Sequence, residues 1–460
     1  MSVFTDTADD TRPTTKPRVV IVGGGMGGIA AAKALAKAPV ELTLLDGHNY
    51  YLFQPLLYEV AGAIVNVEDV THAIRGLLRR QPNAHFRLAE VVAADVDRQE
   101  VALADGERLA YDYLILATGL RSAVERVPGA AAHAYAMKTV EDALALRNHL
   151  LRRLETVAAH PELLAAGALD IVVVGGGTTG VEVIAAFNEI YNQALRDEYP
   201  EIDFTRARIT VFEAGETLLP AFHPKLRAWA HRTLEANGAK VRLRSPVAEI
   251  GPASVTLADG EDVPAGTVVL ATGVRATTLA DSLGVAQAGG RIYVESNLSL
   301  PGHPNVFAVG DMAALPRRDG LHPALAQFAL QGGRHAAREI LRNIARKPSR
   351  PFRYWDKGMT SMVGYNAAIL QSGRLRITGA LGFVLWGALH GYYVPGFRNR
   401  LSLRVTWLWS WATRRRAALL LIGEASPDQP MRREIDVTDT EDRPSVPASA
   451  LPSTVPDDRA

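Results

Sequence analysis

Runs of hydrophobic residues broken by glycine turns occur twice along the chain, in the same order. "RVVIVGGGMGGIAAAKALA" from Arg18 and "DIVVVGGGTTGVEVIAAF" from Asp170 are each typical of a β-branched strand, a glycine turn and an alanine-rich helix. Later in each copy, "ALADGERLAYDYLILATG" from Ala102 and "TLADGEDVPAGTVVLATG" from Thr256 place an Asp-Gly turn between two strand-like runs. Both pairs of segments are separated by nearly the same length of chain. The pattern predicts an α/β fold with two related, Rossmann-like domains.

The chain beyond the second copy has hydrophobic patterns that do not repeat those of the two copies. "NLSLPGHPNVFAVGDMAAL" contains a strand that ends at Gly310 and Asp311, and "HPALAQFALQGGRHAA" then has the spacing of a helix. "RYWDKGMTSMVGYNAAILQSG" is strand-like with glycine breaks, and both ends of the chain are polar with little to bury. We therefore predict disordered tails at 1–16 and 424–460, one domain from 17–133 with 290–345, a second from 134–289, and a C-terminal membrane-association domain from 346–423.

The hydrophobic pattern near the C-terminus is amphipathic. "GALGFVLWGALHGYYVPGF" is interrupted by glycine and proline, and it is shorter than the roughly twenty apolar residues that a membrane span needs. Beyond it, helical spacing links Phe397, Leu401, Val405, Leu408 and Ala412, with Trp407, Trp409 and Trp411 nearby. The stretch has no acid and carries Arg398, Arg400, Arg404, Arg414, Arg415 and Arg416. Because Trp favours the membrane interface and Arg favours anionic lipid, we predict a monotopic membrane anchor. The alternative is a helix that packs against a partner, including a second copy in a homodimer.

Composition removes several classes of chemistry. The 460 residues include no cysteine, which excludes disulfides, iron–sulfur clusters, thiolate metal sites and Cys nucleophiles, and we expect no metal site. The net charge of +1 gives no general reason to expect nucleic acid as a partner. The N-terminal stretch has no apolar core and carries three aspartates before Lys16, so neither a secretory signal nor an Arg-rich transit peptide is expected.

The first glycine turn has the spacing of a dinucleotide site. Gly23, Gly25 and Gly28 give G-x-G-x-x-G between strand and helix, where glycine permits a tight turn and close approach of the backbone to a pyrophosphate. The helix that follows presents free N–H groups to the phosphates. The next strand ends in Asp46, which is placed to accept a hydrogen bond from a ribose hydroxyl. This combination predicts a bound dinucleotide.

The second copy predicts a second dinucleotide. Gly175, Gly177 and Gly180 repeat the turn, and the following strand ends in Glu213. A carboxylate there accepts from a free ribose 2′-hydroxyl and repels a 2′-phosphate, which favours NAD(H) over NADP(H). The gap from the glycines to the acid is long, and we assign the excess to an extended helix and loop around Tyr191 to Arg206. Two dinucleotide sites in one chain suggest a flavin together with its nicotinamide reductant.

Several motifs carry a closer resemblance. "NYYLFQPLLYEVAG", "GGGTTGVEV", "AQFALQGGRHAA", "DKGMTSMVGYNAA" and "YVPGFRNRLSLRVTWLWSWATRRR" resemble the type II NADH dehydrogenases, single-chain NADH:quinone oxidoreductases of the two-dinucleotide-binding flavoprotein superfamily that do not pump protons. The similarity runs from about Arg18 to Gly423. One departure is Thr178, where the family usually has proline. The lack of cysteine agrees with the resemblance, because the disulfide and sulfide:quinone reductases of the superfamily need redox cysteines.

The resemblance implies FAD in the first domain and NADH as the substrate of the second. It places Gly310 and Asp311 at the ribityl chain of FAD, and Thr118, Gly119 and Ala326 against the same cofactor. It places Gly273 beside NADH. Glu182 has two interpretations: a carboxylate at the third position of its helix that stabilises the helix N-terminus, or a residue that reaches the nicotinamide and flavin.

A quinone site is expected on the glutamine helix. Gln327 and Gln331 are four residues apart and therefore share one face of the helix. A quinone carbonyl accepts hydrogen bonds, and a glutamine amide donates without adding a charge. By resemblance these residues form the floor of a quinone tunnel, with Trp386 and His390 at its mouth. The quinone is ubiquinone or menaquinone.

We therefore predict an FAD-dependent enzyme that takes a hydride from NADH and passes two electrons to a membrane quinone. We expect it on the cytoplasmic face of a bacterial inner membrane. Two alternatives remain: a soluble ferredoxin-type NADH reductase of the same fold, and a membrane-bound flavoprotein that senses NADH. The first would not need the C-terminal anchor, and the second would turn over negligibly with quinone.

Overall fold

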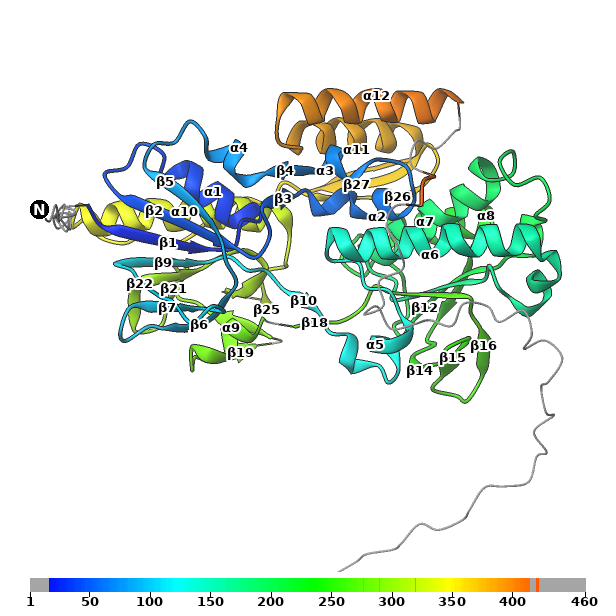
Figure 1. Cartoon of the computed structure of the whole chain (residues 1–460), viewed down its shortest axis with the longest axis horizontal. Coiled ribbons are helices and arrows are strands. Elements are labelled where there is room, and N and C mark those ends of the chain that lie inside the picture. The colour runs from blue at the N-terminus through cyan, green and yellow to red at the C-terminus, as the bar shows by residue number, and fades with distance from the viewer. Residues whose placement is uncertain (1–15, 276, 289, 319, 414–418, 422–460) are drawn as a thin grey trace, which may run out of the picture.

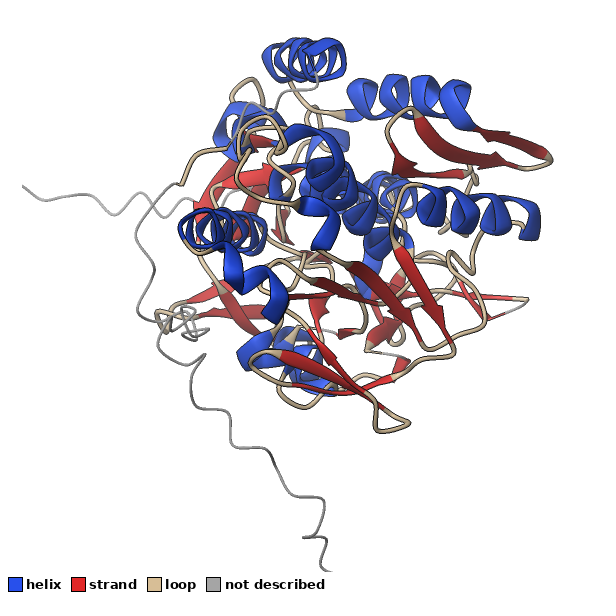
Figure 2. Ribbon diagram, turned by 90° about the vertical axis from the view of Figure 1, so that its right-hand side faces the viewer, coloured by secondary structure: helices blue, strands red, loops and turns tan. Residues whose placement is uncertain are grey.

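A computed structural model describes residues 16–275, 277–288, 290–318, 320–413 and 419–421. It contains two α/β halves side by side, with the C-terminal segment lying across the top of both (Figure 1). The predicted tails, apart from Lys16, and Arg414, Arg415 and Arg416 fall outside the described residues. Figure 2 shows the molecule from the side, with most helices gathered above the strands of the two main sheets.

The first half is built on a six-stranded sheet in the order β21-β22-β9-β1-β2-β5. All neighbours are parallel except β21 and β22. The strands are β1 (Arg18–Val22), β2 (Glu41–Asp46), β5 (Ala84–Leu88), β9 (Tyr113–Leu116), β21 (Ser299–Leu300) and β22 (His303–Ala308). The central strands β1 and β9 are buried on both faces, which is typical of parallel sheets covered by helices, whereas β5 at the edge is partly exposed.

Two helices pack together beside this sheet, α1 (Met26–Ala34) and α10 (Ala326–Ile344). They approach so closely that a Cβ on Gly333 would lie 2.1 Å from the Gly27 carbonyl oxygen. The remaining elements of this half are β3 (Tyr50–Leu52), β4 (Thr71–Ala73), β6 (Val91–Asp95), β7 (Glu100–Leu103), β8 (Arg108–Ala110), α2 (Leu57–Ala61), α3 (Val67–Val70), α4 (Ile74–Leu78), α9 (Thr278–Ser282), β19 (Gln287–Ala288), β20 (Arg291–Tyr293), β23 (Ala313–Ala314), β24 (Pro316–Arg317), β25 (Gly320–Leu321) and the 3₁₀ turns η1 (Gln54–Leu56) and η6 (Gly310–Met312).

The second half repeats the plan with a parallel sheet in the order β13-β12-β11-β17. Its elements are α6 (Val140–Ala159), β11 (Ile171–Val174), α7 (Thr178–Glu189), β12 (Ile209–Glu213), α8 (Pro224–Ala236), β13 (Lys240–Leu243), β14 (Val247–Ile250), β15 (Ser254–Leu257), β16 (Asp262–Pro264) and β17 (Thr267–Leu270), with 3₁₀ turns η3 (Pro161–Ala166) and η5 (Phe204–Arg206). The duplicated α/β architecture predicted from the sequence is confirmed. The expected extension of the second copy is also present, because α7 continues into a π-helical turn, η4 (Ile190–Ala194), before η5.

The chain passes between the halves earlier than predicted on both occasions. It leaves the first half at β10 (Arg121–Ser122), and it returns at β18 (Val274–Arg275), which pairs antiparallel with β10 (Figure 1). The segment between β10 and β11, with η2 (Val124–Arg126) and α5 (Ala130–His133), belongs to the second half, because Ala130 packs in that half's smaller hydrophobic core. α9 belongs to the first half, because the Ser282 hydroxyl accepts from the Ala94 backbone N–H at 3.1 Å. The predicted boundaries at 133/134 and 289/290 are therefore wrong.

The C-terminal segment forms a three-stranded antiparallel sheet and two helices. These are β26 (Met359–Gly364), β27 (Ala367–Ser372), β28 (Leu375–Thr378), α11 (Gly379–Tyr393) and α12 (Phe397–Thr413). α11 packs on β27, and α12 lies beside α11 at the top of the molecule (Figure 1). Within the described ranges, none of the helices combines the length and the apolar character needed to cross a membrane.

Candidate active site

One cavity of about 1700 Å³ connects the two halves with the C-terminal helices. Small-molecule pockets usually hold about 300–1000 Å³, so this one has room for a dinucleotide and a second molecule. Its wall includes Gly23, Asp46, Thr118, Gly119, Glu182, Gly310, Asp311, Ala326, Gln327, His390, Tyr392 and Arg400. Residues predicted from separate motifs are thus brought to one place.

The first glycine turn forms one end of this cavity. Gly23 adopts φ +108°, and a Cβ on Gly28 would lie 1.8 Å from the Gly23 carbonyl oxygen, so both positions require glycine. A Cβ on Gly25 would meet nothing within 4 Å, which leaves open space beside the start of α1. Gly25 caps α1 without a side-chain hydrogen bond, so the first N–H groups of the helix are available to an anion. The residues present fit the pyrophosphate of a dinucleotide.

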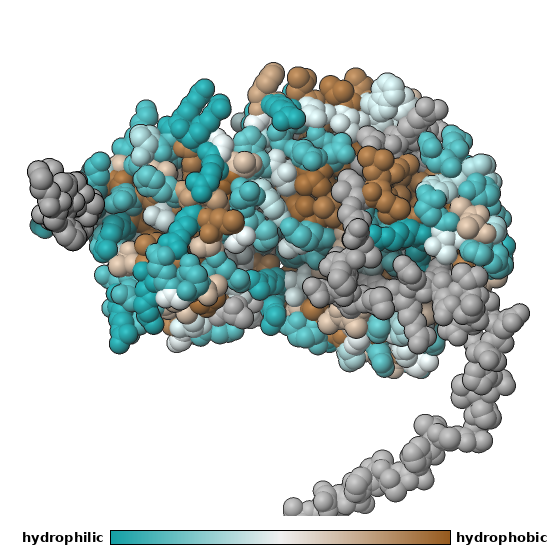
Figure 3. Space-filling model, in the orientation of Figure 1, coloured by the Kyte–Doolittle hydropathy of each residue, from teal (hydrophilic) through white to brown (hydrophobic). Residues whose placement is uncertain are grey.

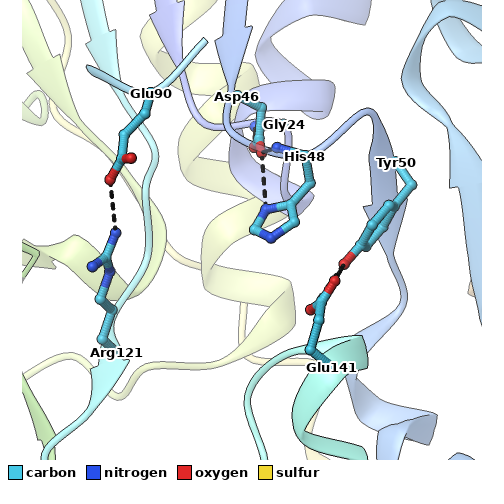
Figure 4. A network of polar contacts seen from close by, with 7 residues as sticks. All are labelled: Gly24, Asp46, His48, Tyr50, Glu90, Arg121 and Glu141. Atoms are coloured by element: carbon cyan, nitrogen blue, oxygen red, sulfur yellow. Dashed lines mark hydrogen bonds and ion pairs between the residues drawn. The ribbon is translucent and has the colours of Figure 1, made fainter. Parts of the chain in front are cut away.

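Asp46 is fixed at the end of β2 by backbone donors. Its carboxylate accepts from the Gly24 N–H at 2.6 Å and from the His48 N–H at 2.7 Å (Figure 4). Two further contacts lie nearby. The Tyr50 hydroxyl of β3 donates to Glu141 of α6 at 2.9 Å, and Arg121 of β10 lies 3.6 Å from Glu90. The Asp46 carboxylate is therefore held in one orientation, as a ribose hydroxyl requires.

The second glycine turn has the same geometry. Gly175 adopts φ +109°, and a Cβ on Gly180 would lie 1.9 Å from the Gly175 carbonyl oxygen. Glu213 accepts from the Gly176 and Gly215 N–H groups, each at 2.6 Å. Thr178, the departure from the family pattern, is the first residue of α7 and leaves this turn unchanged relative to the first.

The middle of the cavity is shaped by the residues expected at the flavin. Gly310 adopts φ +70° in η6, and Thr118 contacts Thr277 at 3.2 Å. Gly119 and Gly273 each follow the end of an equivalent strand, β9 or β17, by three residues, and they have nearly the same conformation, with φ +68° and +67°. Gly273 lies against Ala123, in the connection between the halves. Sequence reasoning missed Arg291, whose guanidinium donates to the carbonyls of Asp311, Ala313 and His322 and so holds the Gly310 motif in place. A lone arginine at the start of the short strand β20 gave no sequence signal for this role.

Glu182 lies in the cavity wall, and its helix-terminus interpretation is wrong. α7 begins at Thr178, so Glu182 is the fifth residue of the helix, beyond its first turn. Its carboxyl is buried and accepts from the Met362 backbone N–H at 3.3 Å. Burial raises the pKa of Glu182 well above its ordinary value, and the nearby Glu59 raises it further. The protonated form is therefore favoured, and the cavity wall holds an acid that can give up a proton.

Glu59 was also missed from the sequence. It is buried on α2, and its carboxylate accepts from the Trp407 indole N–H of α12 at 2.7 Å. Trp407 thus faces inward, in contrast to the prediction that all three tryptophans of this helix mark a membrane interface. The reason is that Glu59 on α2 accepts from this indole, whereas Trp409 and Trp411 remain exposed. The link joins the C-terminal helix to the neighbourhood of Glu182.

The two glutamines of α10 have different surroundings. Gln327 lines the cavity, and in the described part of the chain its amide has no hydrogen-bond partner. Gln331 donates to the Trp355 carbonyl at 2.9 Å and accepts from the Trp355 N–H at 3.0 Å. The predicted position of Gln331 on the tunnel floor is therefore corrected, because the segment around Trp355 crosses the helix there and uses its amide.

Trp386 and His390 are not a pair at the cavity mouth. Trp386 is only 1% exposed and packs 5.2 Å from Trp407, because α12 covers this side of α11, so its predicted place at the mouth is wrong. His390 does line the cavity, buried beside Phe53 at a ring distance of 6.1 Å. Its Nδ1 donates to the Trp386 carbonyl at 2.8 Å, and burial lowers the pKa of His390 to about 4. The ring is therefore neutral at pH 7.

The open space beside the N-cap glycines of α1 and α7 predicts two substitutions, one that weakens only FAD binding and one that weakens only NADH binding. Gly25 and Gly177 occupy equivalent positions, and a Cβ on either would project into open space. Gly25→Ala should therefore weaken FAD retention about tenfold and Gly177→Ala should weaken NADH binding about tenfold, because each methyl occupies space that a pyrophosphate needs. Flavin absorbance after dialysis and NADH titration measure the two effects. Gly251→Ala, where a Cβ makes only ordinary contacts, is the control. Loss of FAD in Gly177→Ala with NADH binding intact would contradict the assignment.

Comparison with known proteins agrees with this geometry. Residues 17–333 match the family described as Pyridine nucleotide-disulphide oxidoreductase. The chain is 35% identical over 427 residues to the type II NADH:quinone oxidoreductase NdhA of Mycobacterium tuberculosis, covering 88% of this chain and 90% of that protein. It is 30% identical over 409 residues to the demethylphylloquinone reductase NdbB of Synechocystis, covering 85% of this chain and 96% of that protein.

Solved structures share the fold. The structure of NDH2 from Plasmodium falciparum in complex with NADH superposes with a TM-score of 0.80 at 20% identity, covering 86% of this chain and 98% of that one. A sulfide:quinone oxidoreductase from Aquifex aeolicus gives a TM-score of 0.69 at 19% identity, covering 84% and 92%. The family match and the relatives above 30% identity establish that this chain is a type II NADH:quinone oxidoreductase of the pyridine nucleotide-disulphide oxidoreductase family.

Proposed function

We propose that this chain carries out its family's reaction at a membrane surface, in the large cavity that Glu182 and Gln327 line, with Glu213 orienting NADH at the second glycine turn. The enzyme depends on FAD and transfers electrons from NADH to a quinone without pumping protons. The overall reaction is NADH + H⁺ + quinone → NAD⁺ + quinol. The observation that carries the proposal is the continuity of the cavity, from the Gly23 turn past Glu182 and Gln327 to Tyr392 and Arg400 at the foot of the C-terminal helices.

The roles follow from the contacts of each side chain. The carboxylate of Asp46, anchored by two N–H groups, orients the adenosine ribose of FAD, and Glu213 does the same for NADH. FAD supplies the redox chemistry, since it can accept a hydride and release two electrons. The amide of Gln327 donates a hydrogen bond to a quinone carbonyl, and protonated Glu182 provides a proton close to the same space.

The C-terminal helices support peripheral attachment to a membrane. Phe397, Leu401, Val405 and Leu408 on α12 are between 53% and 81% exposed, and apolar side chains gather along the upper edge of the molecule over α11 and α12 (Figure 3). Such a face suits a lipid surface, with the arginines of the same segment toward anionic headgroups. We place it on the cytoplasmic face of a bacterial inner membrane, where NADH is available. The alternative is that a second copy of the chain covers the same face in a homodimer.

The test is NADH oxidation by the purified protein with and without a short-chain quinone, after its FAD content has been measured. Turnover that requires quinone supports the proposal. FAD-loaded protein that binds NADH and ignores quinone would instead point to the sensing role. Separate kcat/KM values for a ubiquinone and a menaquinone analogue decide which quinone the enzyme uses.

Glu213 predicts the nucleotide preference. Both of its oxygens are held by backbone N–H groups, so the carboxylate cannot easily turn away from a 2′-phosphate. We expect kcat/KM for NADH to exceed that for NADPH by at least tenfold, and Glu213→Gln to narrow the ratio about tenfold by removing the repulsive charge. Steady-state kinetics with both nucleotides measure the ratio. The control is Asp46→Asn, which alters the flavin site and should leave the NADH to NADPH ratio of kcat/KM unchanged. Equal use of both nucleotides by the unmodified enzyme would refute the assignment.

A further inference from the structure

Four cations line the end of the cavity that lies beside α12, which we call its membrane end. Lys33 lies at the end of α1, Arg334 and Arg338 lie on one face of α10, and Arg400 lies in the first turn of α12. All four line the cavity, and we refer to them as the basic notch. Across the described residues, none of the four has a carboxylate within ion-pair distance. The acids that line the cavity lie on other elements: Asp46, Glu90, Asp142, Glu182 and Asp311.

The cations of the notch repel one another. Burial lowers the pKa of Lys33, and the positive charges of Arg400 and Arg334 lower it further. The charges on three separate elements are therefore close enough to interact. Arg400 donates from Nε to the Val394 carbonyl at 2.7 Å, but no carboxylate of the described residues pairs with any of the four cations. A bound anion would relieve this repulsion, and the tetrahedral oxygens of a phosphate suit several converging cations.

The phosphates of the dinucleotides do not serve this purpose. They are expected at the glycine turn and the N-terminus of α1, which begins at Met26. Lys33 is seven residues further along the same helix, or roughly 10 Å along its axis at 1.5 Å per residue. The notch therefore lies apart from the expected positions of these phosphates.

The surroundings of the notch are those of an amphiphile. The Arg400 guanidinium lies 5.9 Å from the ring centre of Tyr392, which is itself exposed, and Leu389 and Pro395 line the adjoining wall. Phe397, 81% exposed, continues this apolar surface along α12. Positive charge thus meets an open apolar face at one edge. A free phosphate would use only the charges, whereas a phospholipid would use both.

We propose that the basic notch binds the phosphate of an anionic phospholipid, whose acyl chains lie along Tyr392 and Phe397 at the membrane end of the cavity. The proposal rests on the membrane attachment proposed above and adds a specific headgroup site to it. A lipid held there fixes the mouth of the cavity at the level of the headgroups, which is where a quinone leaves the bilayer.

The test uses the full-length, FAD-loaded protein and a soluble lipid. Dihexanoyl phosphatidylglycerol is titrated calorimetrically below its micelle concentration, alongside dihexanoyl phosphatidylcholine and inorganic phosphate. The test variant combines Lys33→Gln, Arg334→Gln and Arg400→Gln. The control combines Lys240→Gln, Arg317→Gln and Arg318→Gln, which removes the same charge from β13 and the β24 hairpin. A third variant keeps the charge with Lys33→Arg, Arg334→Lys and Arg400→Lys.

We expect saturable binding of the anionic lipid by the unmodified protein and the control, and at least tenfold weaker binding by the test variant. The charge-keeping variant should stay within a few-fold of the unmodified protein. Binding that is unchanged in the test variant, absent from the unmodified protein, or equally tight for inorganic phosphate would overturn the proposal. If the triple variant loses FAD, Lys33→Gln and Arg400→Gln are measured singly, and each should weaken binding about threefold. The titration involves neither quinone turnover nor vesicles, so the proposed function can fail independently.

Discussion

Replacing Phe397, Leu401, Val405 and Leu408 together by serine should release the protein from lipid vesicles. Each of these side chains has more than half of its surface exposed on α12, so each loses roughly 1 kcal/mol of burial in lipid when it becomes serine. The sum of roughly 4 kcal/mol corresponds to about a thousandfold lower partition coefficient. Vesicle sedimentation at several lipid concentrations measures this coefficient. FAD content should be unchanged, because the four residues face away from the core.

The control is Leu88→Ser with Val92→Ser, which removes two exposed apolar side chains from β5 and β6 and should not affect sedimentation. Deleting the chain from about Ala380 is a poorer test, because Trp386 and Leu403 are buried and their loss would open the core. If the serine variant sediments like the unmodified protein, the anchor lies elsewhere. If it instead changes from dimer to monomer without lipid, the face is an interface between two copies.

The sequence predicted what is encoded locally. A β-branched strand, a glycine turn and a helix are fixed by neighbouring residues. Both strand–turn–helix units therefore form as predicted, and β2 and β12 end at Asp46 and Glu213 as expected. The domain boundaries were misplaced because the crossing depends on β10 pairing with β18, more than 150 residues away. Two-residue strands carry no periodic signal that would indicate such a pairing.

The same distinction explains the C-terminal helices. Helical spacing correctly predicted an apolar stripe on α12, and that stripe is exposed. It did not predict that Trp407 would turn toward Glu59 or that Trp386 would be covered, because both depend on which element packs on which face. Spacing also placed Gln327 and Gln331 correctly on one helix face. What crosses that face, the segment around Trp355, comes from a distant part of the fold.

Gln327→Leu should slow quinone reduction by about ten- to a hundredfold. Both polar atoms of the Gln331 amide are bonded to Trp355, whereas Gln327 lines the cavity with its amide available. A lost donor to a buried acceptor costs on the order of 1–3 kcal/mol. This free-energy loss corresponds to the expected decrease of about ten- to a hundredfold in kcat/KM for quinone. Leucine approximately preserves the volume and helix propensity of glutamine, so α10 should remain folded.

Stopped-flow measurements separate the effect of Gln327 on quinone from any effect on NADH. Bleaching of the flavin absorbance by NADH should proceed near the original rate in Gln327→Leu, because that step needs no donor at the quinone carbonyl. Ferricyanide, a small anion that does not need the quinone donor, should be reduced almost as before. Gln331→Leu is the matched control on the same helix face. It leaves the exposed Trp355 N–H and carbonyl groups to form hydrogen bonds with water. The rate of quinone reduction should therefore change by less than about threefold. If Gln331→Leu slows quinone reduction more than Gln327→Leu does, then the bond to Trp355 opens during turnover and Gln331 is the donor.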